Sequence, residues 1–450
     1  MAKQNLTRRD FIRRSATSAA GLGYFLNGRW MPLAAAPLPM KPARPSDRVN
    51  IGFIGVGIRG HILTNAAIAT GQANLVVACD TYQGHLDRSK ETTDGKIETC
   101  FCKYKSVLDR KDIDAVIIAT PDHWHLPMAL AALDAGKDVY IEKPMTHSIE
   151  DGPKIIEAAR RNHRVVQVGS QGRSSPLQKK AREIVASGQL GQITKIVASY
   201  NRNSSTGAWN YPIPMDLQDG VNFNWQEWLG SAPQRPYDPE RVFRYRKYWD
   251  YSGGITTDLF VHLITSIHFI MDVKMPQNVV ATGGILVRKD GREVPDTLDA
   301  LFEYDGFHVN MSSTFNNAST AEQGMQFLGT DGSLVLGGNA LSLTPEKHRE
   351  GYQYSIDSWP KAMQEQFWNE GNHREEAKAT SKWEASSFED KTDAVPVHMA
   401  EFFDCVRTRK ECSENAVVGN YAASAGHMVN ISYRSGKKVT WDAATGTASV

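Results

Sequence analysis

Three residues, Lys143, Asp258 and His262, have side chains and surroundings suited to proton transfer. Lys143 directly follows a short apolar run that predicts a buried strand, and the proline after it restricts the backbone. Asp258 and His262 are four residues apart in a stretch that begins with two glycines and then becomes apolar. On a helix this spacing stacks both side chains on one face. An amine beside a carboxylate and an imidazole predicts acid–base chemistry, although a surface lysine and a packed histidine are the ordinary alternatives.

A glycine pattern typical of a dinucleotide site lies near the start of the chain. The apolar run 49–54 leads into Gly55-Val56-Gly57-Ile58-Arg59-Gly60, and a helical pattern follows through Ala69. In a strand–turn–helix unit the first glycine permits the tight turn and the second lets the pyrophosphate approach the backbone. The third glycine lets the helix pack on the strand, and the helix start offers N–H groups to the phosphates. The residues predicted to bind the cofactor here are Gly55, Gly57, Ile58, Arg59 and Gly60.

Asp80 indicates which dinucleotide is bound. It ends a second apolar run, 74–79, and lies twenty residues beyond Gly60. A carboxylate at this place can accept hydrogen bonds from both adenosine ribose hydroxyls and repels a 2′-phosphate. We therefore expect NAD rather than NADP, with Arg59 or Arg88 as the residues able to accommodate a 2′-phosphate instead.

Strand and helix patterns alternate through the first third of the chain. Further strands are predicted at 114–119, 138–141 and 165–169, with helices near 126–135 and 149–162 between them. This alternation predicts an α/β Rossmann fold with a doubly wound parallel sheet, which we assign to residues 48–170. Ligands of such sheets lie beyond the carboxyl ends of the strands. Two strand ends carry polar residues that we expect near the cofactor: Thr120, Pro121 and His125 after one strand, and Glu142 and Lys143 after the next.

Several motifs, taken in order, resemble the glucose-fructose oxidoreductase, inositol dehydrogenase and MocA (Gfo/Idh/MocA) family. They are GVGIRG at 55–60, TPDHWH at 120–125, EKP at 142–144, and Gly253-Gly254 followed by Asp258 and His262. The resemblance extends from about residue 50 to 332. It implies that Lys143, Asp258 and His262 are the catalytic residues and that His125 matches the family's last motif position. Asp122 stands where the family usually has asparagine, which leaves its role open.

The chemistry implied by this resemblance is hydride transfer. Oxidation of an alcohol sends a hydride to the nicotinamide while a base takes the hydroxyl proton, so the site needs a cationic polariser and a proton acceptor. Lys143 suits the first need and His262 the second, with Asp258 orienting the imidazole or holding a substrate hydroxyl. A metal role for the Asp258–His262 pair is disfavoured because no third ligand has metal-site spacing.

Aromatic and arginine residues precede the Asp258 segment. Sugars present apolar C–H faces and many hydroxyls, which suit aromatic platforms beside arginine donors. Among these residues we expect Arg246 and Trp249 to line the substrate pocket, although so many aromatics also suit a core.

The second part of the chain, residues 171–450, predicts an α+β substrate-binding domain with a large, mostly antiparallel open sheet. Strands are expected at 193–200, 279–288, 298–304 and 308–315, and helices at 397–409 and 417–434. In the family the open face of this sheet often forms a dimer or tetramer, so we expect a homo-oligomer. Residues 346–391 are polar and without a clear period, and a substrate lid, an oligomer arm and a plain excursion all remain open.

Length, charge and cysteine content argue against a nucleic-acid-binding protein and a cysteine metal site. The chain has 450 residues, a formal net charge of +1, and no block of like charges after the first fifteen residues. These numbers predict two globular domains and a small-molecule substrate rather than a nucleic acid. The five cysteines have no metal-like spacing, and we interpret them as reduced thiols.

The N-terminus resembles a twin-arginine export signal. Arg8 and Arg9 precede an apolar position and a weakly apolar stretch, 15–26, that is too short and too rich in glycine to span a bilayer. Small residues at 34–36 suit cleavage. We expect a signal peptide at 1–36, a linker arm at 37–47 and a periplasmic mature protein.

Export of a folded protein and a dinucleotide site together suggest that NAD is acquired before export and retained. The leading hypothesis is an exported NAD-dependent oxidoreductase that acts on a sugar or polyol hydroxyl and recycles a tightly bound cofactor. A glycosidase that uses NAD transiently, through oxidation, elimination, hydration and reduction, needs the same residues. A sugar or dinucleotide sensor without catalysis is the third possibility, and intact Lys143, Asp258 and His262 argue against it.

Overall fold

The computed structural model describes residues 42–319, 324–347, 351–376, 378 and 380–450, together with the backbone of two short paired strands, β1 (Phe25–Leu26) and β2 (Arg29–Trp30). Apart from β1 and β2, the signal peptide expected at 1–36 lies outside the described residues, and so do residues 37–41 of the linker expected at 37–47. A 3-10 turn, η1 (Pro45–Asp47), leads into the first domain.

The first domain is a six-stranded parallel sheet in the order β5-β4-β3-β6-β7-β8. Its chain order reverses between β3 and β6, as expected of a doubly wound sheet. The central strands are buried on both faces, since every residue of β6 and β7 is buried. The predicted Rossmann fold is therefore confirmed, with strands β3 (Val49–Ile54), β4 (Ala73–Asp80), β5 (Glu98–Phe101), β6 (Ala115–Ile118), β7 (Asp138–Glu142) and β8 (Val166–Gly169).

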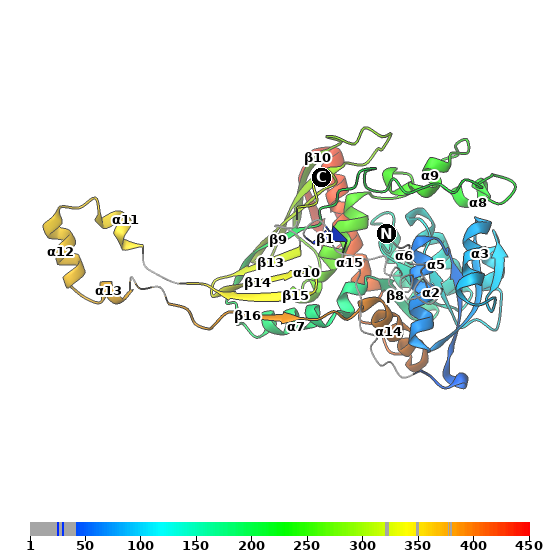
Figure 1. Ribbon diagram of the computed structural model, residues 1–450, viewed down its shortest axis with the longest axis horizontal. Helices are drawn as coiled ribbons and strands as arrows, with labels where there is room; N and C mark the ends of the chain where they lie inside the picture. The colour runs from blue at the N-terminus through cyan, green and yellow to red at the C-terminus, as the bar shows by residue number, and fades with distance from the viewer. Residues whose placement is uncertain are drawn as a thin grey trace, which may run out of the picture.

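Helices cover both faces of this sheet (Figure 1). On one face lie α2 (Ile58–Thr70) and, from the far end of the chain, α14 (Ala394–Thr408), whose Phe402 and Phe403 are fully buried with the residues of β3 and α2. The other face packs against α5 (His125–Asp134) and α6 (Asp151–Arg161). Residues 394–408 thus complete the core of the nucleotide-binding domain, although the sequence analysis assigned them to the second domain. The shorter helices are α3 (Gln83–Thr92), α4 (Tyr104–Leu108), η2 (Asp122–Trp124) and η3 (Gln171–Ser174).

The second domain is built on a ten-stranded sheet in the order β16-β15-β14-β13-β9-β12-β11-β10-β17-β18. All neighbours are antiparallel except β9 and β12, which run parallel, so the prediction of a large, mostly antiparallel open sheet is confirmed. The strands are β9 (Ile193–Ser199), β10 (Asn278–Gly284), β11 (Thr297–Tyr304), β12 (Phe307–Thr314), β13 (Gly324–Gly329), β14 (Gly332–Gly337), β15 (Ala340–Pro345), β16 (Ser386–Glu389), β17 (Val439–Asp442) and β18 (Thr447–Ser449).

The strand expected at 279–288 ends early, at Gly284. The carboxylate of Asp296 accepts hydrogen bonds from the main-chain nitrogens of Leu286, Val287 and Arg288, at 3.0, 2.9 and 2.6 Å. These N–H groups therefore bind the aspartate instead of a neighbouring strand, and the chain forms a loop at this point.

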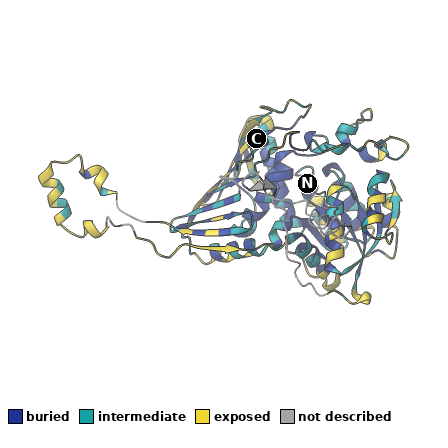
Figure 2. Cartoon of the chain, in the orientation of Figure 1, coloured by how far each residue is buried: buried dark blue, intermediate teal, exposed yellow. Residues whose placement is uncertain are grey.

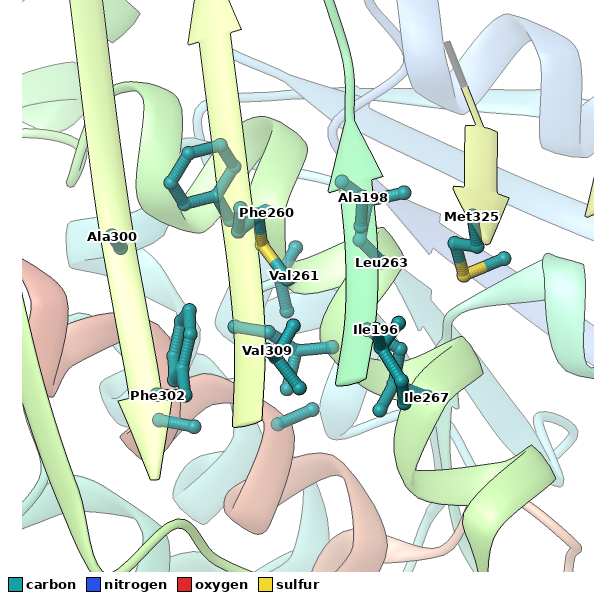
Figure 3. Close-up of a cluster of buried hydrophobic side chains, with 14 of the residues drawn as sticks. Ile196, Ala198, Phe260, Val261, Leu263, Ile267, Ala300, Phe302, Val309 and Met325 are labelled. Atoms are coloured by element: carbon teal, nitrogen blue, oxygen red, sulfur yellow. The ribbon is translucent and has the colours of Figure 1, made fainter. Parts of the chain in front are cut away.

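One face of the large sheet is covered by helices and forms the main core. Residues alternate between buried and exposed along β11 and β12, as the period of a half-buried strand requires. Figure 3 shows side chains of four adjacent strands, among them Ile196, Phe302 and Val309, pointing toward Val261, Leu263 and Ile267 of one helix. The covering helices are α7 (Pro176–Ala186), α10 (Val261–Met271) and α15 (Ala416–Ser435).

Residues 351–376 lie at the end of an arm that extends far from both domains (Figure 1). They form three short helices, α11 (Tyr352–Ile356), α12 (Lys361–Asn369) and α13 (His373–Glu376), and most of their surface is exposed (Figure 2). A small aromatic cluster holds them together, with the rings of Phe367 and His373 stacked at 4.0 Å. The arm lies at the opposite end of the molecule from the nucleotide-binding domain. In this arrangement the arm does not lie over the chain's own site.

The five cysteines are free thiols. Within the part of the chain that the structure describes, no helix has the length and apolar character needed to cross a bilayer. No group of three potential metal-ligating side chains occurs among these residues either.

Candidate active site

The glycine turn between β3 and α2 is a close-packed junction. Gly55 has φ of 85°, and a Cβ there would lie 2.7 Å from the carbonyl oxygen of Ala119. A Cβ on Gly60 would lie 2.2 Å from the carbonyl oxygen of Gly55. Only glycine fits either position, and the start of α2 is thereby held against the end of β3. The turn leaves the N–H groups at the start of α2 available for phosphate oxygens.

Asp80 lies beside this turn at the end of β4. One carboxylate oxygen accepts from the main-chain N–H of Val56 at 2.8 Å, and the other accepts from the N–H of Tyr82 at 3.0 Å and lies 3.2 Å from Nδ1 of His85. Burial alone would raise the pKa of Asp80, but His85 and these donors hold it below its usual value. The carboxylate is therefore ionised, as recognition of ribose hydroxyls requires.

His85 is a residue of this pocket that the sequence analysis missed. Its ring lies against the glycine turn, since a Cβ on Gly57 would be 3.1 Å from the ring. Burial disfavours the charged form of His85, but the adjacent Asp80 carboxylate raises its pKa. The sequence places His85 in the first turn of the helix that follows Asp80, but the contact of its ring with the glycine turn depends on tertiary packing.

A cavity at the glycine turn has walls from both the nucleotide-binding domain and the second domain. The nucleotide-binding domain contributes Gly55, Gly57, Ile58, Arg59, Asp80, Thr120 and Pro121 to its walls. The opposite wall comes from the segment between β9 and the helix that carries Asp258, and includes Tyr211, Phe223, Trp228, Phe243, Tyr245 and Arg246. These walls combine an anion-binding turn for the phosphates, an ionised carboxylate for the ribose and apolar rings for the flat bases. These are the groups that binding of NAD needs.

We call residues 211–249 the covering segment. It contains the short helices α8 (Trp225–Leu229), α9 (Pro239–Phe243) and η4 (Tyr245–Lys247). Its main chain joins the loop after β4, because Gln83 donates to the carbonyl of Asn222 at 2.8 Å and Asn224 donates to that of Thr81 at 3.1 Å. In addition, the hydroxyl of Tyr82 donates to the Asp216 carboxylate at 2.6 Å.

The covering segment is also fixed to the loop after β6. The carbonyl oxygen of Trp228 accepts from the indole Nε1 of Trp124 at 2.7 Å and lies 3.1 Å from Nε2 of His123. The Trp228 ring stacks on Trp225 at 5.2 Å. The covering segment is therefore held against the loops that follow both β4 and β6.

Asp258 is the centre of a charged cluster that includes Arg246, a residue of the cavity wall. One of its carboxylate oxygens accepts from Nζ of Lys143 at 2.8 Å and from Nε of Arg246 at 3.0 Å. The other accepts from the indole Nε1 of Trp209 at 2.9 Å. Lys143 Nζ also donates to the main-chain carbonyl of Asp258 at 2.8 Å. The structure thus brings Lys143, Asp258 and Arg246 together, as the sequence suggested.

The electrostatics of this cluster fix the charge of Asp258. Burial would raise its pKa, but the positive charges of Lys143, Arg246 and Arg202 hold it well below the usual value. An ionised carboxylate that already accepts three side-chain donors is a poor proton acceptor. Asp258 therefore positions Lys143 and Arg246.

His262 lies on the next turn but does not form the expected pair with Asp258. Asp258 belongs to a π-helical turn, η5 (Thr256–Phe260), and α10 begins at Val261. A wider turn offsets side chains that would stack at four-residue spacing in a regular α-helix. Among the hydrogen bonds of the described residues, none joins Asp258 to His262, and the carboxylate orients the lysine and arginine instead of the imidazole.

The His262 ring packs edge-on against Tyr200, with ring centroids 6.4 Å apart. Burial and the nearby charge of Lys143 lower the pKa of His262 well below its usual value. The imidazole is therefore neutral and has a lone pair that can accept a proton.

Glu142 and Arg59 form an ion pair between two cofactor-site elements. Nε of Arg59 donates to the Glu142 carboxylate at 2.8 Å, and Gln171 donates to the same oxygen at 2.8 Å. Arg59 is therefore neutralised, which leaves it poorly placed to hold a 2′-phosphate. This contact ties the start of α2 to the end of β7.

His125 and Asp122 both form polar contacts with other residues of the protein. The ring nitrogens of His125 lie 2.6 Å from the carbonyl of Pro144 and 3.0 Å from that of Thr120, and the residue is 1% exposed. Burial lowers the pKa of His125. This histidine therefore bridges the two strand-end loops and is not among the residues that line the cavity, where the sequence analysis expected it. The hydroxyl of Thr257 donates to Asp122 at 3.5 Å, so the departure from the family motif is accommodated by the helix that carries Asp258.

Trp249 lies apart from this cluster. Its indole Nε1 donates to the carbonyl of Glu293 at 3.1 Å, and the guanidinium of Arg434 lies 5.3 Å from the ring centroid. None of its described contacts joins it to Lys143, Asp258 or His262. The structure therefore places Trp249 as a packing residue and does not bring it into the pocket that the sequence analysis assigned to it.

Comparison with known proteins agrees with this architecture. Residues 49–170 match the model of an oxidoreductase family with an NAD-binding Rossmann fold, and residues 229–335 match the GFO/IDH/MocA C-terminal domain. A glycosyl hydrolase family 109 protein of Shewanella pealeana is 31% identical over 234 residues, which is 45% of this chain and 50% of the relative. An alpha-N-acetylgalactosaminidase of Shewanella oneidensis is 28% identical over 46% of this chain and 50% of the relative. The chain thus spans about half the length of these curated relatives.

Solved structures share the fold at low sequence identity. A levoglucosan dehydrogenase in complex with NADH and levoglucosan has a TM-score of 0.63 and 17% identity, covering 87% of this chain and 99% of that one. An aldose-aldose oxidoreductase from Caulobacter crescentus has a TM-score of 0.60 and 16% identity over the same shares. Together with the two domain matches and the cavity at the glycine turn, these similarities identify the chain as an NAD-binding oxidoreductase of the Gfo/Idh/MocA family.

Proposed function

We propose that this enzyme oxidises a hydroxyl group of a carbohydrate with NAD and regenerates the NAD without releasing it. The observation that supports this most is the cluster at the nicotinamide end of the cavity. There an ionised Asp258 holds Lys143 and Arg246 near a neutral His262. A cation and an uncharged base close together are what alcohol oxidation requires.

Each residue of the cluster has a distinct role in the proposed reaction. His262 accepts the proton of the substrate hydroxyl, because its imidazole is neutral. Lys143 donates a hydrogen bond to the same oxygen and stabilises the negative charge that develops there. Asp258 fixes the Lys143 side chain through both its carboxylate and its carbonyl. NAD, held by the glycine turn and Asp80, supplies the hydride acceptor.

Retention of the cofactor is supported by the covering segment. Hydrogen bonds between residues 81–83 and residues 216–224 hold the covering segment against the loop after β4, on the adenine side of the cavity. A dinucleotide under this segment leaves only when these contacts open, so its dissociation is slow. We further propose that the mature enzyme is periplasmic, since the N-terminus resembles a twin-arginine signal and folded export explains how NAD enters the periplasm.

A second candidate is glycoside cleavage through transient oxidation. The sequence relatives at 31% and 28% identity carry the names of glycosyl hydrolase family 109 and alpha-N-acetylgalactosaminidase. The proton acceptor and cation required for this route are the same two side chains, His262 and Lys143, and retained NAD suits a cycle that begins and ends with the oxidised cofactor.

Product analysis tests the proposal. The purified protein is incubated with a panel of free sugars and aryl glycosides, with and without added NAD, and both NADH absorbance and chromatographed products are followed. An oxidised sugar matched by reduction of a second sugar supports the oxidoreductase. Hydrolysed glycoside without net NADH supports the glycosidase. Absence of any product with an intact, NAD-loaded protein contradicts both and favours a sensor.

A further inference from the structure

Arg202 lies close to the proposed catalytic residues. It follows β9, and its main-chain N–H donates to the carbonyl of Thr314 at 2.9 Å, which fixes the loop against the end of β12. Its guanidinium lies 4.9 Å from the ring centroid of Tyr200 and donates to the Tyr200 hydroxyl at 3.3 Å. Because the Tyr200 ring also contacts the His262 ring, Arg202 and Tyr200 stand beside the proposed base.

Among the described residues, no carboxylate forms an ion pair with the charged side chain of Arg202. The Asp258 carboxylate is shared by Lys143 and Arg246, and Arg202 affects it only from a distance, as one of the charges that lower the pKa of Asp258. No carboxylate forms an ion pair with Arg202 anywhere in the described part of the chain. By contrast, Arg244 pairs with Glu240, and Arg241 pairs with Glu293. A half-buried guanidinium without a counter-ion is costly unless it binds an anion from solution.

Arg202 and Tyr200 together have the chemistry needed to bind a carboxylate. A guanidinium is planar and can donate two parallel hydrogen bonds to the two oxygens of a carboxylate. The Tyr200 oxygen accepts from Arg202, which leaves its O–H free to donate to the same anion. A planar acid group therefore finds up to three donors here, at the side of the cluster that faces His262.

Resting on the proposed function, we propose that the substrate is an acidic carbohydrate, such as a uronic acid, whose carboxylate is bound by Arg202 and the Tyr200 hydroxyl. Binding of the acid group then sets which hydroxyl reaches His262 and Lys143. Arg202 is a specificity residue in this arrangement, because its charge selects the acid over the neutral sugar.

Binding to the NAD-loaded protein tests this without requiring turnover. Calorimetry compares galacturonate and glucuronate with their uncharged methyl esters and with galactose and glucose, while galactose 1-phosphate tests a phosphate in place of the carboxylate. We expect at least one uronate to bind about ten- to a hundredfold more tightly than its methyl ester. Equal affinity of both uronates and their esters, absence of uronate binding, or tighter binding of the phosphate would overturn the proposal.

Variants of Arg202 test whether this residue causes the preference for the uronate over its methyl ester. Arg202→Gln is expected to bind uronate and ester equally, whereas Arg202→Lys keeps part of the preference because the charge remains. Arg160→Gln changes an exposed arginine in the last turn of α6 and keeps the wild-type ratio. Each variant is first checked for unchanged NAD content and melting temperature. A preference that survives in folded Arg202→Gln contradicts the assignment.

The two proposals fail in different ways. If a uronate binds through Arg202 but no sugar is oxidised or cleaved, the proposed reaction fails and the acid site stands. If neutral sugars are oxidised and the uronates show no advantage, the reaction stands and the acid site fails.

Discussion

Nζ of Lys143 lies 2.8 Å from both the carboxylate and the main-chain carbonyl of Asp258, so one aspartate holds the lysine by two groups. Both side chains are 11% exposed. The carboxylate also holds Arg246, which lines the cavity that begins at the glycine turn. Asp258 is in this sense the residue that assembles the site, while His262 is left neutral to take a proton.

Removal of the Asp258 charge is expected to be costly for stability. Asp258→Asn leaves Lys143 and Arg246 without their shared counter-ion, and breaking such a pair typically costs about 3–5 kcal/mol. Urea unfolding at neutral pH measures this loss. Asp134→Asn is the matched control, because Asp134 pairs with Arg161 at the surface and such pairs contribute at most about 1 kcal/mol. Equal losses in the two variants would contradict the account.

The same pair predicts a pH dependence. The pKa of Asp258 is lower in the folded protein than in the unfolded chain, where it is about 3.9. Its contribution to stability is therefore complete above pH 4 and is lost as the pH falls through the folded value. Unfolding free energies of wild type and Asp258→Asn should differ most near neutral pH and converge only in strong acid. A difference that disappears between pH 7 and pH 5 would show that another group is responsible.

Lys143→Ala and His262→Ala are each expected to lower kcat by about 10²–10⁴, because general acid–base groups typically contribute that much. Cofactor content should change little, since both side chains belong to the chemistry and not to phosphate recognition. Lys154→Ala and His308→Ala, which change exposed residues elsewhere, serve as controls. Near-normal turnover in either of the first two variants removes that residue from the mechanism.

The preference for NAD over NADP is expected to depend on Asp80. In Asp80→Ala the carboxylate that repels a 2′-phosphate is lost, and with it the two acceptor oxygens for the ribose hydroxyls of NAD. We expect NADP affinity to rise relative to NAD by at least about tenfold. Titration of both cofactors into cofactor-free protein measures the ratio. Tighter binding of NADP than NAD to the wild type would contradict the role given to Asp80.

The covering segment is expected to control how fast NAD leaves. Tyr82→Phe removes the hydrogen bond from the Tyr82 hydroxyl to Asp216 without changing the ring. Loss of one such bond is worth about 1 kcal/mol, so NAD should dissociate about fivefold faster. Tyr354→Phe, on the exposed arm, is the control with the same chemical change. Unchanged dissociation in Tyr82→Phe would mean that this contact does not retain the cofactor.

The sequence was sufficient for the features that local patterns determine. The strand, glycine turn and helix from Val49 to Thr70 follow from residue types at fixed spacing, and so does the alternation that builds the parallel sheet. The orientation of His262 relative to Asp258 was not predictable, because four-residue spacing assumes a regular α-helix and the chain forms a π-helical turn there.

Long-range contacts account for the other omissions. The covering segment meets the loop after β4 through residues about 140 positions apart, such as Gln83 and Asn222, and no local pattern records such a contact. That Arg202 lacks an ion pair among the described residues is visible only once the neighbouring carboxylates have been matched to their partners. Trp249 was predicted to line the substrate pocket because its ring suits stacking on a sugar. In the structure, Glu293 and Arg434 instead hold it in the packing of the second domain.

The central claim, retention and recycling of NAD on the enzyme, is tested most directly by measuring the cofactor in the purified protein. The mature protein is prepared without added NAD, denatured, and the supernatant is assayed for NAD and NADH. We predict close to one equivalent of cofactor per chain, and turnover with paired sugars or a glycoside in the absence of free NAD. A folded protein that contains no cofactor, and that acts only with added NAD while forming NADH in proportion to product, would contradict the account.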